Sequence, residues 1–144
     1  MLAQAETDNL SLAKDIYDLV SKNDLNRLGM LYADNAVLVN MAWNTAYRGR
    51  HGVLEYVRNF KTAFPDLKLN VSHQVAEEEF VITELVMRGT HKGVFVTPMG
   101  NISPTNRFIE VPMCGVLQFK DGKMVSSRQY FDTGTLMRQL GLIS

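Results

Sequence analysis

The sequence predicts an α+β fold in which N-terminal helices pack on one face of a strongly curved, antiparallel or mixed sheet. The first observation is that apolar residues recur at steps of three and four in the first part of the chain, whereas from Leu67 onward they alternate with a period of two. The second is that two of the expected strands reach about ten residues or more, and long strands in one sheet coil strongly. Helices that cover a coiled sheet leave space at its open end, so we expect an enclosed apolar pocket.

Three helices are expected before the sheet. The first covers residues 9–20, where the apolar residues form one face. Asp24 is a suitable cap for a short second helix over residues 25–31. The third helix, residues 53–64, must end at Pro65, because proline lacks the amide hydrogen and clashes with the preceding turn.

The alternating pattern then predicts a run of strands and a short last helix. A brief strand also lies between the second and third helices. The strands are expected at residues 36–39, 67–71, 81–87, 107–119 and 123–132, and the last helix ends at Gly141.

Composition limits the class of protein. A chain of 144 residues without repeats or linkers indicates one domain over residues 1–144. Lys plus Arg and Asp plus Glu are both 15, so the zero net charge argues against nucleic acid as a partner. One cysteine and three scattered histidines predict neither a disulfide nor a metal site. The N-terminal residues lack a signal-peptide pattern and no apolar run is long enough to cross a membrane, so we expect a cytoplasmic protein.

Several motifs in the second half of the chain resemble one family. The sequence is similar, in order and spacing over nearly its whole length, to the SnoaL-like polyketide cyclases of the NTF2-like superfamily, whose cystatin-like fold is a cone of helices and a curved sheet. The matching segments are Arg88–Gly93, Pro104–Arg107, Phe119–Lys123, Tyr130–Asp132 and Leu136–Gly141.

The resemblance implies cofactor-free chemistry on a hydrophobic carbonyl compound. Cyclases of this family close a ring by an intramolecular aldol reaction, with an aspartate at the end of the last strand as acid and base. Asp132 matches that aspartate, and Gln118 stands where these cyclases carry an assisting histidine, fourteen residues earlier. Gln118 can donate a hydrogen bond but cannot titrate.

Asp132 has two readings. Between Tyr130 and Phe131 on an apolar strand, its carboxyl group would be desolvated, which would raise its pKa and suit it to acid/base catalysis. Alternatively, Asp132 caps the last helix, because it directly precedes Thr133.

The hairpin around Asp121 and Gly122 decides which side chains face the pocket. A three-residue turn with Gly122 in the left-handed conformation would put Cys114 and Gln118 on one face with Arg128, Tyr130 and Asp132. A two-residue turn would place Gln118 on the opposite face. We favour the first, because it directs both family positions toward the pocket.

Other candidates are weaker. His91 is in step with Met87, so it could line the pocket and shuttle a proton. Arg128 could lower the pKa of a nearby carboxylate or bind an anionic substrate, or it could point outward at the rim of the sheet. Trp43 and Asn44 could form part of the pocket wall, and Met87 with other methionines would give it a deformable lining.

Three functions are therefore open. The first is a cyclase-like enzyme that uses Asp132 with Gln118 or His91, and the second is a module that binds an apolar small molecule without transforming it. The third is an epoxide hydrolase-like enzyme, in which Asp132 and Arg128 act with Glu84 or Glu110. We also expect a homodimer, because an outer sheet face carrying Leu117, Phe119 and Phe131 would be costly to leave wet.

Overall fold

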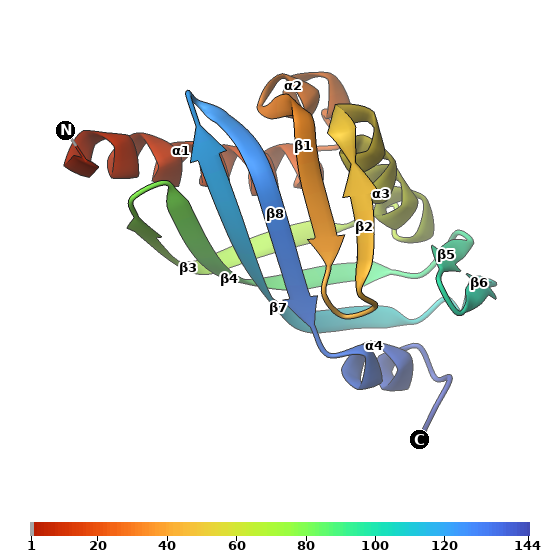
Figure 1. Cartoon of the computed structure of the whole chain (residues 1–144). Coiled ribbons are helices and arrows are strands. Elements are labelled where there is room, and N and C mark those ends of the chain that lie inside the picture. Colours follow the sequence, from red (N-terminus) through yellow and green to blue (C-terminus); the bar gives the residue numbers. More distant parts are fainter. Residues whose placement is uncertain (1) are drawn as a thin grey trace.

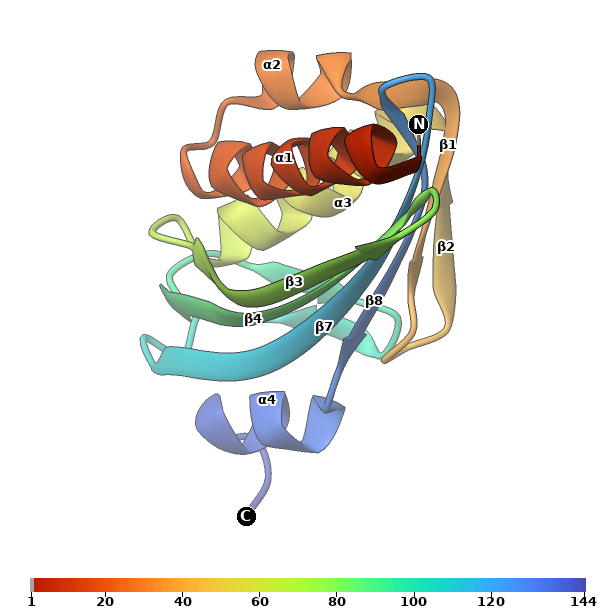
Figure 2. The ribbon, with the colours of Figure 1, turned by 90° about the vertical axis from the view of Figure 1, so that its left-hand side faces the viewer.

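The computed structural model describes residues 2–144, and it has helices on one face of a curved sheet (Figures 1 and 2). The sheet has six strands in the order β2-β1-β8-β7-β4-β3, and a separate two-stranded hairpin is formed by β5 and β6. The helices are α1 (Leu2–Ser21), α2 (Leu25–Met30), α3 (Gly49–Ala63) and α4 (Thr133–Gln139). The strands are β1 (Tyr32–Asn40), β2 (Thr45–Arg48), β3 (Lys68–Glu77), β4 (Phe80–Thr90), β5 (Phe95–Thr97), β6 (Gly100–Ile102), β7 (Phe108–Lys120) and β8 (Lys123–Phe131).

The predicted helices are present, although α1 begins at Leu2 rather than at residue 9, and two expected signals coincide with helix ends. The Asp24 carboxylate accepts a hydrogen bond from the Arg27 amide at 3.2 Å at the start of α2. The helix α3 ends before Pro65, where Phe64 forms the C-cap. Figure 2 shows α1, α2 and α3 on the same side of the sheet, whereas α4 lies beyond the end of β8. None of the described helices is both long enough and apolar enough to span a membrane.

The sheet is mixed, because β1 pairs in parallel with β8 while the other neighbours are antiparallel. The long strands β3 and β4 are joined by a tight turn, in which Glu78 has a positive φ of 54°. The α+β class and the helix-covered curved sheet are thus confirmed. Strands β2, β5 and β6 were not predicted, because three or four residues are too few to display an alternating pattern.

The hairpin between β7 and β8 differs from both expectations. Asp121 and Gly122 both have positive φ, as in a two-residue type I′ turn, and Lys120 pairs with Lys123. Two residues farther on, Val125 is left unpaired in a β-bulge, after which Gln118 pairs with Ser126. The hairpin therefore has the two-residue turn that we did not favour. The bulge nevertheless places Gln118 on the same face as Arg128 and Tyr130, as we expected.

That shared face points away from the helices. Along β7 and β8 the inward positions include Leu117, Phe119, Ser127 and Gln129, all of which are buried. The expectation that Leu117, Phe119 and Phe131 form the outer face is therefore wrong, because they lie on the inner one. The outer face instead carries Cys114, Val116, Gln118, Arg128 and Tyr130.

Candidate functional site

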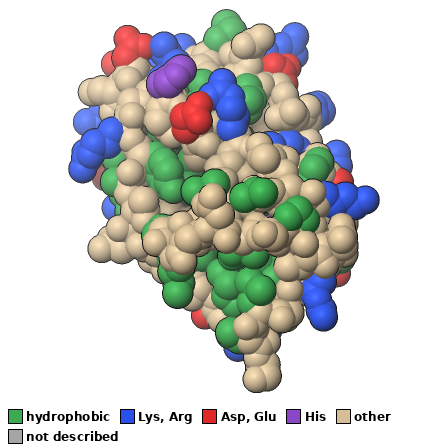
Figure 3. All heavy atoms as spheres, turned by 90° about the vertical axis from the view of Figure 1, so that its right-hand side faces the viewer, with side chains coloured by type: hydrophobic (Ala, Val, Ile, Leu, Met, Phe, Trp, Pro, Cys, Tyr) green, Lys and Arg blue, Asp and Glu red, His purple; other side chains and the backbone are tan. Residues whose placement is uncertain are grey.

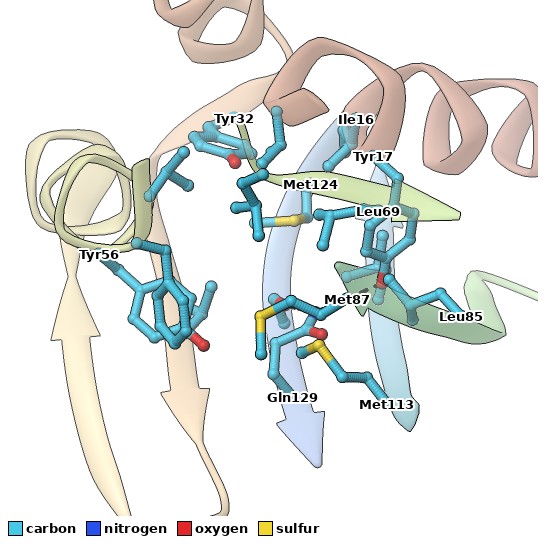
Figure 4. Close-up of a pocket in the computed structure, with 17 residues that line it drawn as sticks. Ile16, Tyr17, Tyr32, Tyr56, Leu69, Leu85, Met87, Met113, Met124 and Gln129 are labelled. Carbon is cyan, nitrogen blue, oxygen red and sulfur yellow. Dashed lines mark hydrogen bonds between the residues drawn. The ribbon is translucent and has the colours of Figure 1, made fainter. Parts of the chain in front are cut away.

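An apolar cavity lies between the helices and the inner face of the sheet (Figure 4). Its volume is about 60 Å³ of space open to water-sized molecules. Helices α1 and α3 supply one wall with Ile16, Tyr17, Tyr56 and Phe60, and the sheet supplies the other. The sheet residues that line it are mostly apolar and include Leu69, Leu85, Met87, Met113, Leu117 and Met124.

A small hydrogen-bonded network interrupts this apolar lining. The side-chain amide of Gln129 donates to Ser127 Oγ at 2.9 Å and to the Tyr17 hydroxyl at 3.4 Å. Tyr17 in turn contacts the hydroxyl of Thr83, which also accepts a hydrogen bond from the Gln74 amide at 3.0 Å. The network ties α1 to β3, β4 and β8, so it fixes the position of the helix above the sheet.

Two polar atoms in the cavity wall have no protein partner. They are the hydroxyl oxygen of Tyr56 and Oε1 of Gln129. Their residues are only 7% and 6% exposed, so neither atom is compensated by bulk solvent. A buried polar group without a partner is costly, and such groups in native proteins commonly have a functional reason.

The ionisable groups of the cavity are tyrosines. Burial raises the pKa of Tyr17 to about 12, and it also raises the pKa values of Tyr32 and Tyr56. All three phenols therefore stay protonated near neutral pH. They can donate hydrogen bonds to a ligand oxygen, but they are poor bases.

The candidates on β7 and β8 lie outside this cavity. Gln118 donates to the Glu79 carboxylate at 2.6 Å, near the turn between β3 and β4. Arg128 and Tyr130 are exposed and Cys114 is half-buried, all on the outer face. The expectation that these residues face the pocket is wrong, because the inner face of both strands is occupied by the alternate residues.

Asp132 occupies the N-cap position of α4. Its carboxylate accepts hydrogen bonds from the Thr135 hydroxyl at 2.7 Å and from the Thr135 amide at 3.0 Å. These bonds hold the pKa of Asp132 below its usual value, with a smaller contribution from Arg138. The expected rise in its pKa is therefore wrong, and the capping interpretation accounts for its contacts.

His91 points inward, but it does not reach the cavity. Its ring is fully buried between Phe64 and Phe95, at centroid distances of 5.3 and 6.3 Å. Nδ1 accepts a hydrogen bond from the Thr105 amide at 3.1 Å, and Nε2 has no protein partner. Burial lowers the pKa of the ring, so His91 is neutral near pH 7.

The remaining predicted wall residues have different positions. Trp43 packs edge-on against Phe95 and Phe131, at centroid distances of 6.0 and 5.5 Å, next to the cavity rather than in it. Asn44 has a positive φ of 51° in the turn between β1 and β2. Met87 does line the cavity, and its contact with a ligand stays a prediction.

Figure 3 shows hydrophobic side chains among polar ones on the face that carries β5 and β6.

The sheet register identifies residues that the sequence interpretation missed. The resemblance implied a functional pair fourteen residues apart on neighbouring strands. The cross-strand pair at that spacing which faces the cavity is Gly115 and Gln129, three residues before Gln118 and Asp132. Gln129 alternates with Phe131 along β8, and the sequence interpretation missed it because it placed Phe131 on the outer face.

In the described part of the chain, the side chains form neither a metal site nor an ion pair of Arg128 with Glu84 or Glu110. Within residues 2–144, no group of three or more histidine, cysteine or acidic side chains is placed to hold a metal ion. Glu110 lies 3.4 Å from Arg88, and Glu84 lies 3.7 Å from His73. Both carboxylates are exposed, and neither residue lines the cavity.

A protein-family model matches most of this chain. The model for the SnoaL-like polyketide cyclases matches residues 11–140. The chain belongs to this family. No curated protein matches it.

Solved structures share the fold. IdmH, a proposed polyketide cyclase from Streptomyces antibioticus, is 30% identical with a TM-score of 0.76, over 92% of this chain and 98% of that one. A proposed SnoaL-like polyketide cyclase from Jannaschia sp. CCS1 is 17% identical with a TM-score of 0.85, over 96% and 95%. A Catenulispora acidiphila protein with a ketosteroid isomerase-like fold, in complex with trimethylamine, is 19% identical with a TM-score of 0.77, over 92% and 93%. The NTF2-like cone is thereby confirmed.

Proposed function

We propose that this protein binds a neutral, largely apolar small molecule with carbonyl oxygens in the inner cavity and promotes its ring closure without a cofactor. One observation carries the proposal: the cavity is lined by apolar side chains and by tyrosine, serine and glutamine, none of which is charged near neutral pH. An ionised ligand would lose its hydration there without gaining a partner of opposite charge. A neutral ligand avoids that cost.

The tyrosines suit the cavity to carbonyl chemistry. A phenol that stays protonated can donate a hydrogen bond to a carbonyl oxygen and stabilise the negative charge that develops on it during bond formation. In a site with little water such a donor acts more strongly than it would in solution. Tyr56 is the clearest candidate, because its hydroxyl has no protein partner.

The ring closure itself needs no ionised residue. A β-dicarbonyl compound enolises readily, and its enol carbon is a nucleophile. The new carbon–carbon bond forms between this enol carbon and a second carbonyl carbon. The enol oxygen becomes a carbonyl as it releases its proton, and the alkoxide formed at the second carbonyl takes up a proton to become a hydroxyl group. The protein would hold the folded conformer and polarise the accepting carbonyl.

The second candidate is a module that binds the same class of molecule and does not transform it. The lack of a carboxylate or histidine among the residues that line the cavity favours this candidate. Both functions require the cavity, and they differ only in turnover.

An aromatic triketone can distinguish a cyclase from a module that only binds. We would incubate the protein with 1-phenylhexane-1,3,5-trione, which is neutral. Its terminal methyl carbon, as the enol carbon of the C5 ketone, bonds to the benzoyl carbonyl carbon, and loss of water gives 5-phenylresorcinol. Binding is measured by calorimetry and product by chromatography. Binding with faster formation of 5-phenylresorcinol than in buffer supports the cyclase, and binding without it leaves the non-catalytic module. If the triketone does not bind, the proposal fails.

A pair of variants tests whether the triketone binds in the cavity. Leu69 lies on the edge strand β3 and lines the cavity, so Leu69→Phe should fill part of it and weaken binding of the triketone. Asn70→Phe adds a phenyl group to the same strand on its other face, and it should leave binding unchanged. Equal effects of the two variants would place the ligand elsewhere.

A further inference from the structure

Two unpartnered polar atoms face the cavity from opposite walls. Tyr56 comes from α3 and Gln129 from β8, and their side chains approach the same space from the two sides (Figure 4). The Tyr56 hydroxyl can donate a hydrogen bond, whereas Oε1 of Gln129 can only accept one. The two atoms thus offer complementary hydrogen bonds to a molecule placed between them.

The orientation of the Gln129 amide follows from its neighbours. Thr83 Oγ1 accepts from the Gln74 amide at 3.0 Å and also interacts with the Tyr17 hydroxyl. If Tyr17 donates to Thr83, its oxygen is free to accept the 3.4 Å bond from Nε2 of Gln129. Nε2 also donates to Ser127 at 2.9 Å. The amide nitrogen is therefore occupied by the network, and the amide oxygen is the atom left for a ligand.

A glycine makes room for this arrangement. An ideal Cβ at Gly115 would lie 2.0 Å from the Tyr17 hydroxyl and 2.9 Å from Nε2 of Gln129. Any side chain at Gly115 would therefore displace the hydroxyl or the amide. The missing side chain allows both groups to lie directly over β7.

Methionines line the cavity together with these two residues. Figure 4 shows the side chains of Met87 and Met113 in the same pocket as Tyr56 and Gln129. Both polar atoms are buried. Methionine is unbranched and polarizable, and it adapts its conformation at low cost. A ligand can therefore reach the two atoms by displacing thioether side chains rather than backbone.

We propose that Gln129 and Tyr56 select the ligand of this cavity: a neutral molecule that presents a hydrogen-bond donor to Gln129 and an acceptor to Tyr56. Hydroxylated ketones and enolised β-diketones have this chemistry. The proposal rests on the proposed function only in that the same cavity must bind a neutral apolar molecule. It adds that selectivity comes from an amide oxygen and a phenol placed on opposite walls.

Three molecules that share one bicyclic frame test the proposed selectivity. Indane has no polar group, 1-indanone has an acceptor, and 5-hydroxy-1-indanone has an acceptor and a donor. Calorimetry at pH 6.5 with the wild-type protein should give affinities that increase in this order. Each added hydrogen bond is expected to strengthen binding by roughly two- to tenfold.

Two variants assign the two bonds. Gln129→Met has a similar size and should remove the advantage of 5-hydroxy-1-indanone over 1-indanone, while 1-indanone still binds more tightly than indane. Tyr56→Phe should remove the advantage of 1-indanone over indane, while 5-hydroxy-1-indanone still binds more tightly than 1-indanone. Circular dichroism checks that each variant is folded, and because the two variants act on different bonds, either one alone is informative.

The outcomes separate this inference from the proposed function. If the wild-type protein binds none of the three molecules, the proposed function fails, and the inference fails with it. If all three bind with equal affinity, or if the preference for the hydroxyl persists in folded Gln129→Met, the cavity stands and the selectivity is overturned. Loss of the preference for the hydroxyl group in Gln129→Met, together with loss of the preference for the carbonyl group in Tyr56→Phe, supports the inference.

Discussion

The hydroxyl of Tyr17 occupies the space that a side chain of Gly115 would need. An ideal Cβ at Gly115 would be 2.0 Å from that oxygen, far inside the contact distance of two atoms. Tyr17 comes from α1 and Gly115 from the middle of β7, so this contact sets how closely the first helix approaches the sheet. It also holds the network around Gln129 in place.

Gly115→Ala should therefore destabilise the protein. The added methyl group forces Tyr17 and Gln129 to move within a packed interior, and such overpacking costs about 1–3 kcal/mol of unfolding free energy. Denaturant titration measures the change, and binding of a cavity ligand should weaken as well. Gly134→Ala is the matched control, because a Cβ there meets only flexible side chains of Arg138 and Asp132 at 3.3 Å or more. This control should be neutral or should stabilise by roughly 0.4–1 kcal/mol. Equal stabilities of the two variants would contradict the packing argument.

Asp132 should matter for stability rather than for binding. Asp132→Ala removes the bonds to Thr135 and should lower the unfolding temperature, whereas Asp132→Asn keeps an acceptor and should lower it less. The pKa of Asp132 is lowered by the Thr135 bonds. Its stabilising contribution is thus present above the unfolded pKa of about 3.9 and is lost as pH falls through the lower folded value. Loss of cyclisation in a folded Asp132→Asn variant would restore the acid/base interpretation.

Periodicity was sufficient to predict the order of the main elements. The helices over α1, α2 and α3 and the long strands β3, β4, β7 and β8 follow from steps of 3.6 and two, together with Asp24 and Pro65 as end signals. The strand β1 runs from Tyr32 to Asn40, longer than the predicted 36–39, because the exposed polar residues Asp34 and Asn35 interrupt its apolar pattern. Short strands such as β2 depend on tertiary pairing, which no local pattern encodes.

The site was harder to predict, for two physical reasons. The inner face of β8 carries the polar Ser127 and Gln129, while its outer face carries Tyr130, so polarity does not distinguish the two faces. The bulge at Val125 also shifts the register by one residue, which a hairpin turn alone does not reveal. Asp132 thus seemed inward in the sequence, although β8 has already ended at that point.

The outer face of the sheet predicts a homodimer. Ile82 pairs with Val116 there, next to the pair formed by Cys114 and Tyr130, and the Ile82 side chain is exposed. An apolar patch of this kind is costly in water, and a second copy would bury it. We expect a dimer by light scattering, and Ile82→Lys should convert it to a monomer. Val96→Lys changes an exposed valine on β5, away from this face, and should remain dimeric. A monomeric wild-type protein would exclude the interface.

His91 should make the stability of the fold depend on pH. Its ring is buried against Phe64 and Phe95, and desolvation lowers its pKa below the ordinary value of 6.5. The unfolded chain therefore takes up a proton at a higher pH than the folded one does. Since the unfolded state binds more protons in that window, stability is full above about pH 6.5 and declines as pH falls toward the folded pKa.

A substitution can isolate this effect from other titrations. His91→Asn retains an acceptor for the Thr105 amide and removes the titrating ring. Its unfolding temperature should vary less than that of the wild-type protein between pH 7.5 and about 5, which thermal unfolding monitored by circular dichroism would measure. His73→Asn is the control, because His73 is exposed near Glu84 on β3 and β4. If both variants keep the wild-type pH dependence, the buried ring of His91 is not its origin.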